Sequence, residues 1–171
     1  YINFGGGFGV SNNSFEFDFR EIGVYYSKVL ERISQYFGRS IQLKIEPGRI
    51  IMASAGNLYA QVTNVKQLKG KKQIVINAGF AEFVRPRLYG AYHEVVALDL
   101  NREIELSDIR ANTSMQSDFL GRDKLLPKLR EGDIVTIRNV GAYGAAMASG
   151  FPGKVKPKEI LFLLRGEIKE I

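Results

Sequence analysis

The stretch Tyr1-Ile-Asn-Phe-Gly-Gly-Gly-Phe-Gly9 decides the fold prediction. Its first four residues predict a short buried strand, and the glycines follow at once as a turn. Ile41–Ile45 alternates as a second strand and ends in Glu46-Pro-Gly-Arg49. Between the two strands, apolar residues recur at helical spacing: Phe19, Ile22, Tyr26, Leu30, Ile33 and Phe37. Strand, glycine turn, helix and strand form one βαβ unit, which predicts two neighbouring parallel strands.

The helix between these strands has recognisable ends. Asp18 is the expected N-cap, with Ser14 as the alternative, and Gly38 stands where a helix commonly ends. Two strands alone cannot bury a parallel sheet on both faces. A domain rarely starts in the middle of an element, yet this chain begins at Tyr1 without Met. We therefore expect a fragment whose preceding part holds the rest of the sheet.

The periodicity changes from helical to strand-like near Ile50. A short helical turn is expected only near Asp123–Leu129. The strands expected beyond the change are Leu58–Val65, Gln73–Asn77, Tyr92–Leu100, Asp133–Asn139 and Ile160–Leu164. We therefore predict two domains, residues 1–50 and an antiparallel β-domain over residues 51–171.

Composition excludes several classes of protein. Hydrophobic residues make up 45% of the 171 residues and charged residues 25%, as in globular proteins. The absence of Cys excludes disulfides and thiolate metal sites, and the single histidine, His93, argues against a histidine-rich metal site, so no metal is expected. Lys and Arg exceed Asp and Glu by 24 to 18, but the basic residues are dispersed, which argues against nucleic-acid binding and leaves an acidic protein partner open.

The glycine turn has two interpretations. Gly5, Gly6 and Gly7 let backbone N–H groups point toward one anion, and the following helix N-terminus adds a favourable dipole. The turn could equally be a tight connection between strand and helix. The second turn favours an anion site, because Gly48 again clears space and Arg49 adds a permanent cation. Loops after adjacent late strands of a (β/α)8 barrel converge on one phosphate in this way.

Glu46 also has two interpretations. It could cap a neighbouring group or pair with Lys44 or Arg49. Alternatively, its carboxylate could face a protonated ring nitrogen, as in pyridoxal phosphate, where positive charge on the ring makes it a sink for electrons. The residues alone leave both interpretations open.

Arg85 and Tyr89 are candidates for binding a carboxylate. A guanidinium can hold a carboxylate with two parallel hydrogen bonds, and a phenol adds a third donor. The competing interpretation is that Arg85 pairs locally with Glu82 while Tyr89 packs within the β-domain.

Several motifs occur in an order that resembles a known family. Besides the two turns, they are Asn77-Ala-Gly79, Arg85-Pro-Arg-Leu-Tyr89-Gly-Ala-Tyr-His93, Gly132-Asp133 and Gly141-Ala-Tyr143-Gly-Ala-Ala-Met-Ala-Ser149. Together they resemble the C-terminal half of the diaminopimelate decarboxylases, which are fold type III (alanine-racemase-like) pyridoxal-phosphate decarboxylases. The resemblance implies an α/β plus all-β fold: the last part of a (β/α)8 TIM barrel followed by a C-terminal β-domain. It also implies a homodimer with shared active sites, to whose interface the β-domain contributes.

The resemblance assigns roles to individual residues. It implies that Glu46 faces the cofactor's ring nitrogen, that Tyr143 is a catalytic group near cofactor and substrate, and that His93 is structural. Arg85 and Tyr89, assisted by Arg49, would bind the distal carboxylate of the substrate. The lysine that binds the cofactor covalently belongs to an early barrel strand, outside this sequence. The residues that would bind the phosphate of pyridoxal 5'-phosphate are Gly5, Gly6, Gly7, Gly48 and Arg49.

One loop departs from the family's pattern. The loop that serves the partner subunit usually reads Cys-Glu-Ser-(Ser/Gly)-Asp, whereas this chain has Thr113-Ser-Met-Gln-Ser-Asp118. Ser114 therefore replaces the cysteine proposed as proton donor, and a hydroxyl is a far weaker acid than a thiol of pKa about 8.5. Ser114 could orient a water or relay a proton, with Tyr143 or the absent lysine as the donor. Met115 replaces a glutamate that meets the distal ammonium of diaminopimelate.

These departures lead to three functional hypotheses. Because Met115 cannot balance an ammonium group, the first is a carboxy-lyase for an amino acid with a distal carboxylate or acyl group. A glutamyl group on an acidic acyl carrier protein, as in secondary metabolism such as antibiotic biosynthesis, fits that expectation. The second is diaminopimelate decarboxylation in lysine biosynthesis, and the third is a catalytically inactive binding or regulatory homologue. We expect a cytoplasmic protein that binds neither membranes nor nucleic acid.

Overall fold

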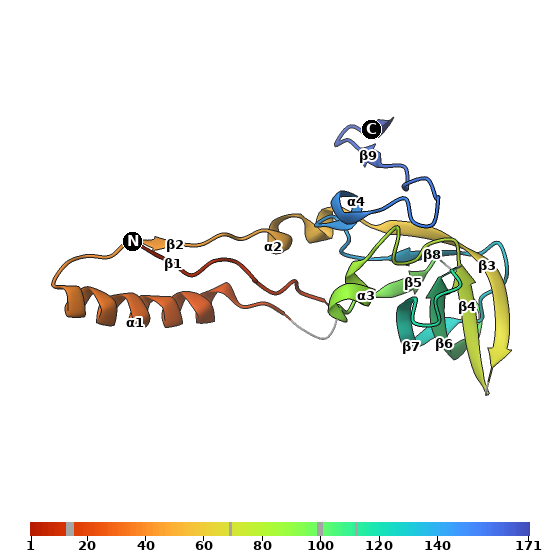
Figure 1. Cartoon of the computed structure of the whole chain (residues 1–171), viewed down its shortest axis with the longest axis horizontal. Coiled ribbons are helices and arrows are strands. Elements are labelled where there is room, and N and C mark those ends of the chain that lie inside the picture. Colours follow the sequence, from red (N-terminus) through yellow and green to blue (C-terminus); the bar gives the residue numbers. More distant parts are fainter. Residues whose placement is uncertain (13–15, 69, 99–100, 112) are drawn as a thin grey trace. The chain divides into compact units, whose positions relative to one another are not determined.

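A computed structural model describes residues 1–12, 16–68, 70–98, 101–111 and 113–171 (Figure 1). The chain divides into two compact units, Tyr1–Ala53 and Ser54–Ile171, where the sequence placed a boundary near Ile50. The alternative cap Ser14 and the last two residues of the strand expected at Tyr92–Leu100 lie outside the described residues. None of the described helices combines the length and the apolar character needed to cross a membrane.

The first unit contains a long helix and two very short parallel strands. Strand β1 is Ile2–Asn3, helix α1 is Phe19–Phe37 and strand β2 is Leu43–Lys44. Ile2 stands opposite Leu43, so the parallel pair predicted from the βαβ pattern is confirmed. Both strands are shorter than predicted, although hydrogen bonds from Phe4 to Lys44 and from Glu46 to Gly5 continue the backbone pairing beyond them. Helix α2 (Arg49–Met52) and the 3-10 helix η1 (Ala53–Ala55) follow β2.

Helix α1 begins and ends at the residues that its sequence predicts. The carboxylate of Asp18 accepts hydrogen bonds from the N–H groups of Arg20 and Glu21, at 2.7 and 3.3 Å. Gly38 ends the helix with a φ of 62°, a conformation that costs glycine little. Tyr26 packs against Phe4 with ring centroids 4.8 Å apart, yet no residue of α1 is buried within the unit. One helix and two strands are thus part of a layer rather than a complete core.

The second unit is built on a six-stranded sheet with the order β5-β8-β3-β4-β6-β7. All neighbouring pairs run antiparallel except β4 and β6, which are parallel with Ile74 opposite Ile109. Strand β3 joins the two halves, since its first residues pair with β8 and the rest with β4. The strands are β3 (Leu58–Leu68), β4 (Lys71–Ile76), β5 (Val95–Ala97), β6 (Ile104–Ala111), β7 (Phe119–Pro127) and β8 (Ile134–Ile137).

The core of this unit lies against the sheet and is made of aliphatic side chains with one aromatic ring, Phe83. The two edge strands approach each other, since a Cβ atom on Gly121 of β7 would lie 3.5 Å from Val95 of β5. Two short helices, α3 (Arg85–Tyr89) and α4 (Gly144–Met147), interrupt the sheet connections. A separate antiparallel hairpin, β9 (Ile160–Phe162) with β10 (Ile168–Glu170), ends the chain.

Most of the strands expected in the second unit are present, but three points of the prediction need correction. Residues 123–129, expected to form a helical turn, lie largely in β7, and β6 was not predicted at all. Asp123 explains the first error: its φ of 52° interrupts the alternation of the strand, while Asp108 accepts its N–H at 2.9 Å. The parallel β4–β6 pair likewise departs from the expected antiparallel domain, because a long connection through α3 and β5 separates these strands.

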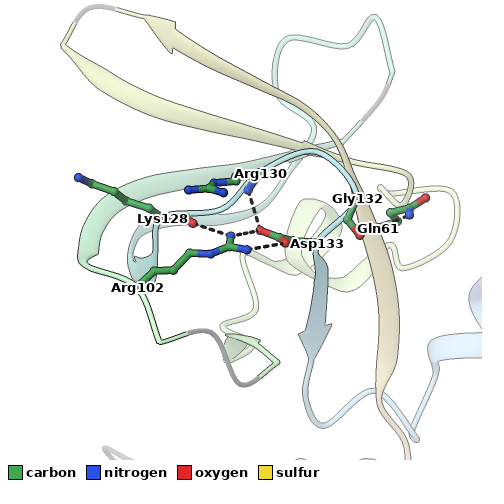
Figure 2. Close-up of polar contacts among 6 residues, drawn as sticks. All are labelled: Gln61, Arg102, Lys128, Arg130, Gly132 and Asp133. Atoms are coloured by element: carbon green, nitrogen blue, oxygen red, sulfur yellow. Dashed lines mark hydrogen bonds and ion pairs between the residues drawn. The ribbon is translucent and has the colours of Figure 1, made fainter.

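A polar cluster fixes the turn that precedes β8 (Figure 2). The carboxylate of Asp133 accepts two hydrogen bonds from the guanidinium of Arg102, at 2.5 and 3.2 Å, and one from the N–H of Arg130 at 2.7 Å. Arg102 also donates to the carbonyl of Lys128 at 2.9 Å. These hydrogen bonds from Arg102 are the main reason that the pKa of Asp133 is lowered, although partial burial acts in the opposite direction.

We expect Asp133→Ala to lower the free energy of unfolding by about 1–3 kcal/mol at pH 7, because Arg102 and Arg130 lose their shared acceptor. Since the folded-state pKa lies below the unfolded one, this stabilisation is full above about pH 4 and is lost as the pH falls through the folded-state value. Urea unfolding at pH 7 and pH 3 measures both effects. Glu103→Ala, which breaks an exposed ion pair with Lys128, is the control, and an equally small loss for both variants would contradict the assignment.

Candidate functional site

The triple-glycine turn lies directly against the Glu46–Arg49 turn. The N–H of Glu46 donates to the carbonyl of Gly5 at 2.7 Å. A Cβ atom on Gly6 would lie 2.3 Å from the carbonyl oxygen of Glu46, so no side chain fits between the turns. Gly5 and Gly7 have φ values of 68° and 81°, which glycine adopts without strain. The two predicted turns therefore form one feature at the ends of β1 and β2.

Two charged side chains belong to this pair of turns. Nη2 of Arg49, which follows Gly48 at the start of α2, donates to the carbonyl of Phe8 at 3.3 Å. The carboxylate of Glu46 accepts a hydrogen bond from Nδ2 of Asn3 at 2.6 Å, in place of the basic neighbours considered from the sequence. The first unit thus brings a side-chain-free backbone turn, a cation and an oriented carboxylate together. The N–H groups and the cation suit a phosphate, and the carboxylate suits a protonated ring nitrogen.

A second cluster surrounds Arg85 in the other unit. Pro86 stands in the first turn of α3, and Gly90 ends the helix with a φ of 60°. Arg85 is only 7% exposed, and its Cζ lies 5.5 Å from the ring centroid of Tyr89 and 6.0 Å from that of Tyr143. The guanidinium of Arg85 therefore makes cation–π contacts with two tyrosine rings. The hydroxyl groups of these tyrosines are hydrogen-bond donors close to the guanidinium.

Tyr143 has a strained backbone. Its φ is 65° and its ψ is 5°, a left-handed conformation that a bulky side chain rarely adopts. The residue stands immediately before α4, and its ring is about half exposed although it lies near Arg85. Such strain persists where the surrounding structure requires it and is concentrated at functional sites, which makes Tyr143 a candidate for a role beyond packing.

The loop that carries Ser114 and Met115 is closed by a buried carboxylate. Asp118 is 1% exposed and accepts hydrogen bonds from Oγ1 of Thr113 at 2.7 Å and from the N–H of Phe80 at 3.0 Å. The N–H of Asp118 donates to the carbonyl of Met115 at 3.2 Å. Ser114 itself is exposed and Met115 is half-buried. Asp118 therefore joins the two ends of this short loop and connects the loop to the segment that follows β4.

A second carboxylate lies near Asp118. Glu82 accepts the N–H of Gly79 at 2.7 Å and pairs with Nζ of Lys154 at 3.1 Å. Gly79 has no room for a side chain, since a Cβ atom would lie 2.7 Å from Oδ2 of Asp118. Burial raises the pKa of Asp118, and the negative charge of Glu82 adds to the increase, while the hydrogen bonds from Thr113 and Phe80 oppose it.

The structure gathers the residues predicted from the sequence into groups within each unit. Gly5, Gly6, Gly7, Glu46, Gly48 and Arg49 lie together in the first unit, while Arg85, Tyr89 and Tyr143 lie together in the second. His93 has the contacts of a structural residue: Nδ1 lies 2.9 Å from the carbonyl of Arg138, and its ring packs edge-on against Phe83.

Sequence reasoning assigned no role to two residues that organise the loop, Asp118 and Arg87. Nε of Arg87, which lies between the two residues of the expected carboxylate clamp, donates to Oγ of Ser117 at 3.1 Å. A signal was present in both motifs, since Asp118 keeps the register of the family loop and Arg87 lies in the Arg-Pro-Arg-Leu-Tyr stretch. The contact itself joins residues far apart in sequence, which spacing does not predict.

Comparison with known proteins identifies the class to which these features belong. The model of the pyridoxal-dependent decarboxylase C-terminal sheet domain matches residues 18–141, and the chain belongs to this family. Similar proteins include the diaminopimelate decarboxylase of Methanothermobacter thermautotrophicus, 33% identical over 94% of this chain and 39% of that protein. That of Campylobacter jejuni is 31% identical over 100% of this chain and 41% of the relative.

Solved structures give the same result. Diaminopimelate decarboxylase from Methanocaldococcus jannaschii matches with a TM-score of 0.84 and 29% identity over 98% of this chain and 39% of that chain. The Helicobacter pylori enzyme complexed with L-lysine matches with a TM-score of 0.80 and 33% identity over 98% and 40%. The chain spans about two fifths of the length of the curated relatives it matches. The predicted fold class, the last part of a barrel followed by a β-domain, is confirmed.

We expect Gly6→Ala to destabilise the protein by about 1–3 kcal/mol, because the new methyl group forces the two turns apart. Gly23→Ala is the matched control: Gly23 is exposed in α1 with open space around it, and alanine there should stabilise the helix by about 0.5–1 kcal/mol. Thermal unfolding of the whole protein measures both changes. A Gly6→Ala variant as stable as the wild type would show that the turns are not in close contact.

We expect Asp118→Ala to cost about 2–4 kcal/mol of stability, because the partly buried N–H of Phe80 and hydroxyl of Thr113 lose their acceptor. Asp118→Asn keeps an acceptor and should cost less. Because the folded-state pKa of Asp118 is raised, the wild type should lose stability as the pH rises from about 4 to the folded-state value. The Asn variant should lack this part of the pH profile. Denaturant unfolding from pH 4 to pH 8 tests this, and equal losses for the two variants would contradict the acceptor role.

Proposed function

We propose that this chain forms the C-terminal part of a pyridoxal-phosphate-dependent amino-acid decarboxylase. The observation that carries the proposal is the close contact between the glycine turn and the Glu46–Arg49 turn at the ends of two parallel strands. The glycine turn excludes every side chain and stands beside a fixed cation, an arrangement that suits the phosphate of a cofactor. Membership of the pyridoxal-dependent decarboxylase family supports the same conclusion.

The first unit contains residues suited to hold the cofactor. Backbone N–H groups of Gly6 and Gly7 and the guanidinium of Arg49 would bind the phosphate. The N–H of Gly5, which the sequence also suggested, instead donates to Oδ1 of Asn3 at 2.8 Å. Glu46, oriented by Asn3, would face the ring nitrogen and keep it protonated. When bound, pyridoxal phosphate supplies a conjugated ring that accepts the electron pair left at Cα as carbon dioxide departs. The covalent lysine of the family lies outside this sequence.

The second unit contains residues suited to hold the substrate. Arg85 would bind a distal carboxylate through two parallel hydrogen bonds, and the hydroxyl of Tyr89 would add a third. Tyr143 would stand near the reacting carbon and hold or deliver a proton from its hydroxyl. Ser114, a weak acid in the position of the family's cysteine, would at most orient a water or relay that proton.

Diaminopimelate is the substrate that the comparisons favour. The relatives reported above are diaminopimelate decarboxylases, and none of their names points to a carrier-bound glutamyl group. The observation that favours a second candidate, an amino acid with a distal carboxylate or acyl group and no distal amine, is Met115. This half-buried thioether stands where the family has a carboxylate for the distal ammonium. The proposal includes a homodimer in which this loop contributes to the active site of the partner subunit.

The substrate question is testable in the whole enzyme. Carbon dioxide release from meso-diaminopimelate is compared with release from a carrier-protein-bound glutamyl group. If diaminopimelate is the substrate, the wild type forms lysine, and Met115→Glu raises kcat/KM about tenfold by supplying the missing charge partner. Met115→Gln is the control, because glutamine has the shape of glutamate but no charge, and it should not raise kcat/KM. An equal increase of kcat/KM in both variants would show that the charge of the new side chain is not the cause.

Cofactor binding is tested separately by the visible absorbance of the protein reconstituted with pyridoxal phosphate. Arg49→Ala should weaken binding about tenfold or more, because a permanent cation beside the phosphate is lost. Arg39→Ala, which removes an exposed arginine just beyond α1, should leave the affinity unchanged. A whole protein that stays colourless with excess cofactor would favour an inactive homologue.

A further inference from the structure

The loop from Thr113 to Asp118 is held by contacts in its second half as well as by the contact between its two ends. Asp118 closes the ends through Thr113, as described above. Next to Asp118, Oγ of Ser117 accepts a hydrogen bond from Nε of Arg87 at 3.1 Å. Arg87 lies on α3 between Arg85 and Tyr89, so the helix that carries the expected carboxylate clamp also holds this loop.

A second arginine reaches the loop from the sheet. Nη2 of Arg110 in β6 donates to the carbonyl of Gln116 at 3.1 Å, and Nη1 donates to Oε1 of Gln73 at 3.1 Å. The guanidinium of Arg110 also lies over the ring of Phe119, with Cζ 4.7 Å from its centroid. Two neighbouring residues of the loop, Gln116 and Ser117, are thus held by arginines from two different elements.

We propose that Arg87 is a positioning residue, which fixes the loop so that Ser114 and Met115 are presented in one conformation. The proposal rests on the proposed function and deepens it, because it explains how an exposed loop that serves a decarboxylase site is ordered before substrate binds. Loss of the Arg87–Ser117 hydrogen bond would lower the fraction of the loop in the competent conformation. The apparent affinity for substrate falls by that fraction, whereas the chemical step of the bound substrate is unchanged.

The competing explanation is an exposed hydrogen bond without consequence. Arg87 is solvent-exposed, and many surface contacts of charged side chains contribute little. The two explanations differ in a measurable way. A positioning contact couples Arg87 to Ser117, so that removing either partner has the same effect as removing both. An inconsequential contact produces neither coupling nor a change in the loop.

The test uses the whole protein with five variants: Arg87→Ala, Arg87→Lys, Ser117→Ala, the double alanine variant and Arg165→Ala. Arg165 is exposed in the turn between β9 and β10 and serves as the matched control for losing a surface arginine. Hydrogen exchange is followed at the amides of Asp118 and Phe119, which donate to carbonyls within the loop. KM and kcat are measured with meso-diaminopimelate.

We expect exchange at these amides and KM to rise roughly two- to tenfold in Arg87→Ala and Ser117→Ala, with kcat nearly unchanged. The double variant should resemble either single variant, and Arg165→Ala should resemble the wild type. Arg87→Lys should restore part of the protection, because an ammonium group can also donate to Ser117.

Unchanged exchange in Arg87→Ala, or additive effects in the double variant, would overturn the proposal. A wild type that binds no pyridoxal phosphate and releases no carbon dioxide would instead overturn the proposed function. Hydrogen exchange then still decides whether Arg87 orders the loop, because this measurement does not depend on activity.

Discussion

The buried carboxylate of Asp118 is the interaction on which the arrangement of the second unit depends. It joins the loop after β6 to the N–H of Phe80 beyond β4, two segments that meet only because β4 and β6 are neighbours. Gly79 is required at this point, since any side chain would collide with the carboxylate. Glu82 and Lys154 extend the same polar cluster to the segment after α4. A single acidic group thereby sets the positions of several loops at one end of the sheet.

The first unit relies on a different constraint, the absence of side chains where two turns meet. Gly6 brings one backbone against the carbonyl of Glu46, and the hydrogen bond from Glu46 to Gly5 fixes their register. Arg49 and Glu46 then extend from a rigid corner rather than from a mobile loop. For a site that recognises a phosphate, rigidity matters because oriented N–H groups and a fixed cation need no rearrangement when the anion arrives.

Local features of this molecule could be predicted from its sequence, and non-local ones could not. The cap at Asp18, the end at Gly38 and the parallel strands flanking α1 follow from spacing and residue type. Strand β6 pairs with β4, a strand distant in sequence, so local spacing does not predict it. Strand β7 was missed as well, and it contains the irregular residue Asp123, whose backbone is left-handed. The two glycine turns were recognisable from their composition, and the structure brings them together at the ends of β1 and β2.

The same division applies to the candidate site. Arg85, Tyr89 and Tyr143 were recognised through a family resemblance, whereas their mutual contact comes from the fold. Arg87 and Asp118 act through contacts that no local pattern encodes, a hydroxyl on another loop and a backbone N–H far along the chain. Residue types can therefore suggest which groups bind a ligand, but the groups that hold them in place emerge only when the distant segments are seen together.

The parallel pairing of β4 with β6 has a consequence for the order of assembly. Helix α3 lies inside the long connection between these strands, so its final position is set only once a pairing between remote segments has formed. Hairpins such as β3–β4 and β6–β7 close short loops and can form early, whereas the parallel pair must close a much longer one. The helix bearing Arg85 should thus be among the last parts to settle during folding. A formed α3 helix would therefore indicate that the whole sheet has assembled.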